Sequence, residues 1–255
     1  MLAAAGALLW VLLSEPRGPL ISGKPVAYWT RQLRAGHMDP VVIAVQGNSA
    51  SYWTRRLHAG HMDPDVIGAL ASDKAVAVPA LVRQLSLPDS RVKDAVKRLW
   101  RRLPAPLRAR IPEPTTRGEL RAGAAFALVM IWQNEFLPRS EPSLSEAQIM
   151  LPSLTKGLQD RNLWVRLNVA IALGHLGVIS VQAIESCEVA MKDTDWSVRG
   201  NAVVSLGQLA TTDARAIPHI KLALSDSHPG VRRRAAEQLR IAPSRDDASI
   251  ATEAK

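Results

Sequence analysis

Hydrophobic positions along the chain recur with the spacing of a helix face, and the whole pattern returns every 33 residues. A Val-Arg pair stands at 165–166, 198–199 and 231–232. Relative to each valine, apolar residues occupy positions −11, −7, +4, +8 and +11, which follows a helical period and not the alternation of a strand. Upstream, Val92-Lys93 and the weaker Leu120-Arg121 look like further copies. The pattern therefore predicts tandem helical repeats.

Polar residues between positions −7 and 0 predict a turn and then a new helix start. Position −3 holds Asp89, Asn162, Asp195 and His228 in turn. Asp and Asn side chains can cap a helix by accepting a bond from an orphan backbone N–H, and Pro229 suits the first helical position. Each unit is thus two short antiparallel helices that cannot bury their apolar stripes alone. The units should stack into an α-solenoid, so the predicted fold class is all-α.

A proline opens the first helix of three copies (Pro79, Pro152 and Pro218), and an ending such as Ala-Leu-Gly-His-Leu-Gly closes the unit at 172–177. With the turn Asp and the Val-Arg pair, these features resemble HEAT repeats, most of all the short bacterial HEAT-like repeats first named from phycobilisome lyases. The resemblance covers residues 75–103 and 147–242. It implies a structural ladder between turn aspartates and post-valine arginines: Asp160, Asp193 and Asp226 with Arg166, Arg199 and Arg232. It does not by itself imply lyase activity.

The resemblance and the changes in composition divide the chain into six predicted segments. They are a hydrophobic signal or anchor (residues 1–20), a duplicated Tyr-Trp helical cap (21–74), a first HEAT-like block (75–133), an insertion loop (134–146), a second block of three repeats (147–242) and a disordered tail (243–255). The second unit of the first block is degenerate, because residues 104–114 carry four prolines where a first helix should lie.

Residues 2–13 form a run of 12 without a charge. As a helix this run would span about 18 Å, less than the ~30 Å hydrocarbon core of a bilayer, so it suits the h-region of a signal peptide. No Lys or Arg precedes it, which a start codon assigned too late would explain. We expect export or membrane anchoring through residues 2–13. The alternative is an amphipathic or buried first helix, and the protein would then be cytoplasmic.

The segment 28–40 is almost repeated at 52–64, an offset of 24 residues that differs from the main period. In each copy a tryptophan and the leucine four residues later (Trp29 and Leu33, Trp53 and Leu57) fall on one helical face, and they are expected to cap the first repeat. His37 and His61, with Asp39 and Asp63 nearby, suggest a metal site. A metal needs three or four converging ligands, however, and one copied loop explains these residues without it. We expect no metal and no other cofactor.

The chain shows no motif for catalysis, so we expect a non-enzymatic protein. Its 47% hydrophobic content excludes wholesale disorder, and its single cysteine excludes a disulfide framework. Cys187 shares its register with Leu154 and Ile220, which predicts a small hydrophobic residue in the core. His175 and His219 stand in no pattern with a nucleophile.

Charge is the strongest feature that the repeat does not explain. The 32 Lys and Arg exceed the 23 Asp and Glu by nine, and residues 83–121 alone carry eleven basic against four acidic residues. In the helix expected at 91–103, apolar residues should face inward (Val92, Val96, Leu99, Leu103) and basic residues outward (Lys97, Arg98, Arg101, Arg102). This stripe could contact nucleic acid, an anionic membrane or an acidic protein, or be a solvated face.

Trp164 and Trp196 lie in the turns before second helices, where they either staple adjacent repeats or anchor a partner. The leading hypothesis is a HEAT-like protein-interaction scaffold, exported or membrane-tethered, that binds an unidentified protein on the inner surface of the stacked second helices. The second is nucleic-acid binding through the 83–121 stripe. Bilin lyase activity is the third and rests on the family name alone. The oligomeric state stays open.

Overall fold

The computed structural model describes residues 20–21, 24–25, 71, 74–111, 113–133 and 141–242. Several expectations concern residues outside these ranges and stay predictions. These residues are the anchor 2–13, the two copies 28–40 and 52–64 that contain His37 and His61, residues 134–140 of the insertion, and the tail 243–255. Two very short strands, β1 (Leu20–Ile21) and β2 (Lys24–Pro25), pair in antiparallel fashion ahead of the helices.

Helices make up almost all of the remaining described structure. In chain order they are α6 (Lys74–Leu85), α7 (Arg91–Arg102), α8 (Ala105–Arg108), α9 (Arg117–Gln133), α10 (Leu144–Gly157), α11 (Leu163–Leu173), α12 (Ser180–Ala190), α13 (Trp196–Leu209), α14 (Ala216–Leu222) and α15 (Pro229–Ile241). Short 3₁₀ turns at Gly177–Ile179 and Ala223–Ser225 adjoin α12 and α14.

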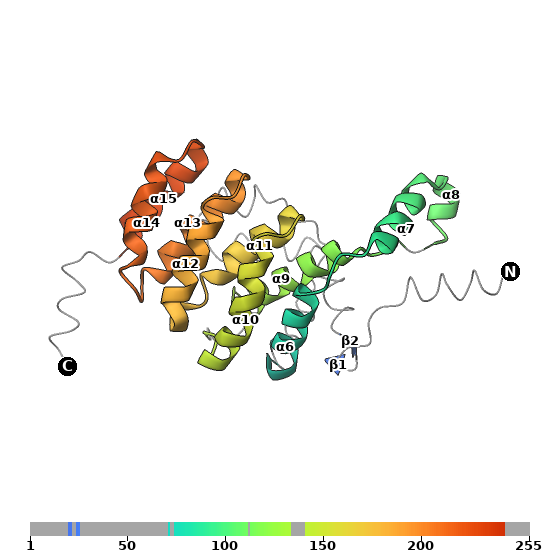
Figure 1. Ribbon diagram of the computed structural model, residues 1–255, viewed down its shortest axis with the longest axis horizontal. Helices are drawn as coiled ribbons and strands as arrows, with labels where there is room; N and C mark the ends of the chain where they lie inside the picture. Colours follow the sequence, from blue (N-terminus) through green and yellow to red (C-terminus); the bar gives the residue numbers. More distant parts are fainter. Residues whose placement is uncertain are drawn as a thin grey trace.

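Two layers of helices stack along the molecule (Figure 1). The first helices of the units, α6, α10, α12 and α14, form one layer, and the second helices, α9, α11, α13 and α15, form the other. Each first helix packs on its partner in the other layer, and α9, α11, α13 and α15 pack on one another in succession. In the first-helix layer α6 packs on α10, and α10 packs on α12. The predicted all-α HEAT-like solenoid is therefore confirmed.

Side-chain caps mark the starts of several helices, whereas α12 and α14 begin without one. Asn162 accepts a bond from the Trp164 N–H at the start of α11, and Asp195 accepts one from the Ser197 N–H at the start of α13. Ser143 begins α10 with a reciprocal capping box to Glu146. These caps satisfy backbone donors that have no intrahelical partner.

The prolines of the first helices lie inside the helices instead of opening them. Pro79 is the sixth residue of α6, and Pro152 is the ninth of α10. The sequence interpretation of proline-led helices is wrong for these two. In α10 the reason is the Ser143 capping box, which starts the helix two turns earlier than the proline would.

The core lies between the two layers, where the repeat pattern predicts it. Leu154, Cys187 and Ile220, which share position −11, are fully buried. The valines at position 0, Val165 and Val198, are fully buried as well. The same register in successive units thus builds one continuous apolar core, which is what makes the stack cooperative.

The first unit departs from this register, because its second helix is α9 and not α7. In later units, the arginine after the valine donates to a turn carbonyl six residues earlier, as Arg166 does to Asp160 O at 3.0 Å. In the first unit Arg121 of α9 makes this bond with Leu87 O at 2.9 Å, across 34 residues. The turn of the first unit therefore contains about 28 extra residues, counted from that repeat geometry.

These extra residues, 89–116, form an arm that contains α7 and α8 and projects beyond the stack (Figure 1). The expectation that Val92-Lys93 opens a second helix of the array is wrong. Val92 is 54% exposed and Leu99 is 62% exposed, although both were expected to face inward. The longer and more apolar α9 takes that place and buries Leu120 and Leu128.

Lys97 was expected on the outer face of α7, and this too is wrong, because its side chain is buried at the base of the arm. Its ammonium pairs with Glu113 at 2.9 Å and with Glu119. Glu119 also forms a capping box with Thr116 at the start of α9, where Thr116 N donates to its carboxylate at 2.9 Å. Lys97 therefore joins the arm to the first residues of α9.

Membrane insertion was expected of residues 2–13, which the described ranges do not include. Of the helices in those ranges, none is on its own both long and apolar enough to cross a bilayer. One pair, Leu163–Leu173 with Gly177–Ala190, reaches the length and composition together and is bent by 82° at its break.

Replacing Lys97 by methionine should loosen the arm. The substitution leaves Glu119 without its buried cation, so we expect the free energy of unfolding to fall by about 1–3 kcal/mol and trypsin to cut the arm faster. Urea unfolding followed by circular dichroism, with limited proteolysis, measures both. Lys192→Met removes an exposed lysine and serves as the control. Equal stability and equal cleavage rates in the two variants would contradict the role of Lys97.

Candidate functional site

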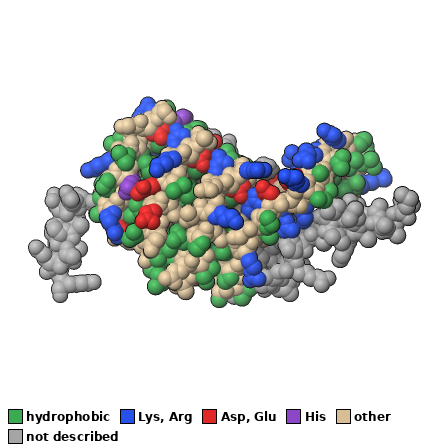
Figure 2. Space-filling model, viewed as in Figure 1, with side chains coloured by type: hydrophobic (Ala, Val, Ile, Leu, Met, Phe, Trp, Pro, Cys, Tyr) green, Lys and Arg blue, Asp and Glu red, His purple; other side chains and the backbone are tan. Residues whose placement is uncertain are grey.

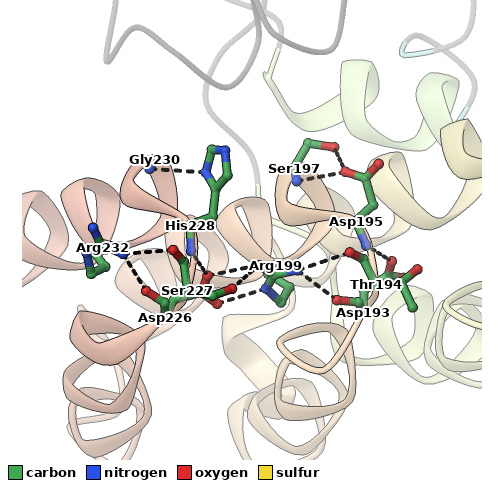
Figure 3. Close-up of polar contacts among 10 residues, drawn as sticks. All are labelled: Asp193, Thr194, Asp195, Ser197, Arg199, Asp226, Ser227, His228, Gly230 and Arg232. Carbon is green, nitrogen blue, oxygen red and sulfur yellow. Dashed lines mark hydrogen bonds and ion pairs between the residues drawn. The ribbon is translucent and has the colours of Figure 1, made fainter.

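The turns between paired helices carry a row of arginine–aspartate ion pairs, which we call the turn ladder. Figure 3 shows its Arg199–Asp226 pair. Arg199 donates through Nε and Nη2 to the two carboxylate oxygens of Asp226, each at 2.8 Å. Arg166 makes the same two-pronged contact with Asp193, at 2.8 and 3.3 Å. Each pair joins one unit to the next, and two parallel charged bonds fix the geometry as well as the distance.

Each residue of the ladder also holds its own turn. The Asp193 carboxylate accepts from the Asp195 N–H at 2.8 Å, and Asp226 accepts from the His228 N–H at 2.8 Å. Arg199 donates through Nη1 to Asp193 O at 3.0 Å. The aspartate thus shapes the turn that precedes its second helix and at the same time receives the arginine of the previous unit.

The sequence interpretation missed one rung, formed by Arg121. Its guanidinium donates to Asp160 at 2.6 and 3.2 Å and to Asp89 at 2.6 Å. The signal was present in the weak Leu120-Arg121 copy. It was obscured because the two partners are 39 residues apart, whereas Arg166 and Asp193 are 27 apart.

The ladder's last predicted arginine, Arg232, makes the turn contact but has no following aspartate within the described residues. Its Nη1 donates to Asp226 O at 2.7 Å and to Ser227 O at 2.9 Å. The structure therefore brings Asp160, Asp193 and Asp226 into the ladder with the arginines of the preceding units. Arg232 remains at the end of the row.

Electrostatics agree with the geometry of the ladder. The hydrogen bond from Arg199 holds the pKa of the Asp226 carboxyl below its usual range, and the same bond raises the pKa of Arg199. Partial burial acts to raise the pKa of the Asp195 carboxyl, but the hydrogen bonds that it accepts from Ser197 outweigh burial and lower the pKa. These carboxylates stay ionised at neutral pH and accept the hydrogen bonds that hold the turns.

The predicted tryptophans are half-buried at the starts of α11 and α13. The Trp196 ring stacks on His228 of the next unit, with ring centres 4.1 Å apart, so it staples adjacent repeats. Arg234 lies over the same indole at 5.8 Å. A Cβ on Gly200 would fall 2.2 Å from Nη1 of Arg234, so the glycine makes room for the guanidinium. Burial, and then the neighbouring Arg233, lowers the pKa of Arg234 to about 10.

The basic residues predicted to bind a partner differ in their exposure. Arg98, Arg101 and Arg102 are exposed on α7, whereas Lys97 is buried in its ion pairs. The exposed part of the stripe belongs to the projecting arm and not to a face of the stack. Trp164 and Trp196 instead lie in the stack, at the starts of α11 and α13, so the six predicted binding residues belong to different parts of the molecule.

The described residues include one cysteine, Cys187, and it is fully buried. Burial raises the pKa of the Cys187 thiol, which keeps it protonated and unreactive. Among the described residues, no group of three or more His, Cys, Asp or Glu side chains could hold a metal ion. A recess between the first two turns is lined by the ladder residues Arg121 and Asp160, which already bond to each other.

The stacked pairs and the turn ladder define an α-solenoid of tandem repeats. Residues 151–240 match the family model described as HEAT repeats, so this part of the chain consists of HEAT repeats. A crystal structure of an engineered protein matches with 17% identity and a TM-score of 0.38, covering 88% of this chain and 69% of its own. A search of curated proteins finds no match.

His175 should make stability depend on pH between pH 7 and 5. Burial lowers the pKa of this histidine to about 4, so the unfolded chain takes up a proton near the ordinary value and the folded chain does not. The free energy of unfolding should fall by roughly 1–2 kcal/mol over this range. In His175→Gln this part of the loss should disappear, while the His219→Gln control keeps it. Urea unfolding at several pH values measures this dependence. If the free energy of unfolding falls equally with pH in the wild type and in His175→Gln, His175 is not its cause.

Proposed function

We propose that this protein is a non-enzymatic scaffold that binds a protein partner along its first-helix layer. HEAT repeats make helical scaffolds for protein interaction, and the family match runs from the middle of α10 to the end of α15. The observation that carries the proposal is a set of exposed aliphatic side chains on successive first helices. They are held in a fixed spacing by the turn ladder, so a partner would meet a preformed surface.

Three aliphatic side chains mark this surface: Ile149 on α10, Val189 on α12 and Leu222 on α14, all exposed. Leu144 and Val181 are exposed on the same layer. Large apolar side chains that stay in water on neighbouring elements favour a binding surface over a solvated face. Their spacing along the stack suits an elongated partner that touches several units at once.

The burial of the second helices supports the first-helix layer over the inner surface that the sequence favoured. Within α13 only Gln208 is exposed, and within α11 every residue is buried or half-buried. A partner that needs side chains to contact finds few of them on those two helices. The first helices α10 and α12 expose residues on nearly every turn.

The proposal also includes a tether to a membrane, or export, through residues 2–13. Its support is the uncharged run in the sequence, which suits the h-region of a signal peptide. A tether would keep the stack at one location while the first-helix layer binds.

Polyanion binding is the second candidate function, since Arg98, Arg101 and Arg102 are exposed on the arm. Phosphate contacts of this kind release counterions, so they weaken steeply as salt is raised. Salt and nuclease therefore separate this candidate from the scaffold.

The test is a pull-down from a host lysate with the full chain, with and without nuclease, at low and raised salt. The variant Ile149→Asp, Val189→Asp and Leu222→Asp places three charges on the proposed surface. The control Gln148→Asp, Gln182→Asp and Ser225→Asp places three charges at exposed polar positions on the same layer. Both variants should keep the wild-type circular dichroism and melting curve, since all six residues are exposed.

We expect proteins that resist nuclease and salt, cross-link to α10, α12 or α14, and are lost from the aliphatic variant alone. The same proteins retained by both variants would contradict the proposed surface. Recovery that collapses with nuclease and salt would replace the scaffold by a polyanion binder.

A further inference from the structure

The α7–α8 arm exposes an apolar row and many arginines together. Val92 and Leu99 stand two helical turns apart on α7, and Leu107 of α8 is exposed as well. Around them lie exposed arginines at six positions: Arg91, Arg98, Arg101, Arg102, Arg108 and Arg110. Figure 2 shows Lys and Arg side chains beside hydrophobic ones over this arm. The acidic side chains of the arm are few, and two of them, Asp89 and Glu113, pair with Arg121 and Lys97.

Contacts inside the arm hold α7 and α8 in place, and with them the exposed apolar row and the exposed arginines. The Trp100 indole N–H donates to Ile111 O at 3.0 Å, which ties α7 to the segment after α8. The Arg108 guanidinium lies 5.9 Å from the centre of the Trp100 ring. At the base, Lys97 holds α7 to Glu113 and Glu119. The arm is thus preorganised, so binding through it orders few additional side chains.

We infer that the α7–α8 arm docks on an anionic lipid bilayer. A basic helix with aliphatic residues on one side lies in the membrane interface, with the aliphatic side in the acyl boundary and the arginines at the headgroups. Arginine stems extend along apolar surface while the guanidinium reaches the phosphates. The exposed row on α7 and its flanking arginines have this arrangement. The inference stands apart from the proposed scaffold, since the arm lies outside the stack.

Charge and burial separate a bilayer from the other candidates for this face. A nucleic acid would satisfy the arginines but leave Val92 and Leu99 in water, because phosphate contacts need no aliphatic row. Residues 26–70, which make up most of the predicted Tyr-Trp cap, offer no charge complement to the arm. They include slightly more basic than acidic residues: Arg31, Arg34, Arg55 and Arg56 against Asp39, Asp63 and Asp65.

Vesicle flotation of the full chain tests the inference, with phosphatidylcholine vesicles and with vesicles in which one third of the lipid is phosphatidylglycerol. The arm variant is Arg98→Glu, Arg101→Glu and Arg102→Glu. The control is Lys192→Glu, Lys221→Glu and Arg240→Glu, which makes the same charge change at exposed residues of the stack. Residues 2–13 are identical in all forms, so their contribution cancels in the comparison.

We expect the arm variant to lose affinity for phosphatidylglycerol vesicles by on the order of 100-fold, and the control by less than about threefold. Equal losses in the two variants, or no preference of the wild type for phosphatidylglycerol, would overturn the inference.

A second variant, Val92→Gln with Leu99→Gln, keeps every charge and changes only exposed side chains. Vesicle affinity should fall roughly tenfold, because the aliphatic side no longer enters the interface. Binding of a labelled DNA duplex, followed by fluorescence anisotropy, should be unaffected by this variant. If the arm binds duplex more tightly than vesicles and the glutamines change neither, the arm is a nucleic-acid surface and the inference is wrong.

Discussion

The bond between an arginine of one turn and an aspartate of the next is the interaction on which the described array depends. Helices as short as α11 and α12 bury too little apolar surface to be stable alone, so each unit needs its neighbours. Apolar packing between units is not directional and would tolerate sliding. The two-pronged Arg166–Asp193 contact sets the register, because it is satisfied at a single relative position of the two turns. The same aspartate shapes the following turn, so one side chain couples local and long-range order.

This coupling also explains how the first unit accommodates a long insertion. Arg121 finds a turn carbonyl at Leu87 and an aspartate at Asp160, so the register survives although the connection contains two further helices. The inserted arm can therefore expose apolar side chains that would have to be buried in the stack. Exposed Val92 and Leu99 are tolerated there because the arm does not have to pack between layers. The first-helix layer and the arm are thus two separate surfaces with different chemistry.

Much of the fold follows from the sequence, since a fixed period with apolar residues on one helix face leaves few other architectures. The aspartates and arginines of the ladder could be assigned through the family resemblance, and Trp196 as a staple through its place in the turn. The choice between α7 and α9 could not be made locally. Residues 91–103 have the pattern of a stacked helix, and the packing of α9 on α6 and α11, with the partners of Arg121, identifies α9 as the member of the stack. The burial of Lys97 was missed for the same reason, because Glu113 and Glu119 reach it from beyond its own helix.

A double-mutant cycle on Arg199 and Asp226 tests the role of the ladder most directly. The variants Arg199→Met and Asp226→Asn, alone and together, are compared by urea unfolding. A charged, two-pronged bond that joins two units should give a coupling energy of about 1.5–3 kcal/mol. A coupling below roughly 0.5 kcal/mol, the range of many exposed ion pairs, would show that apolar packing sets the register without the ladder.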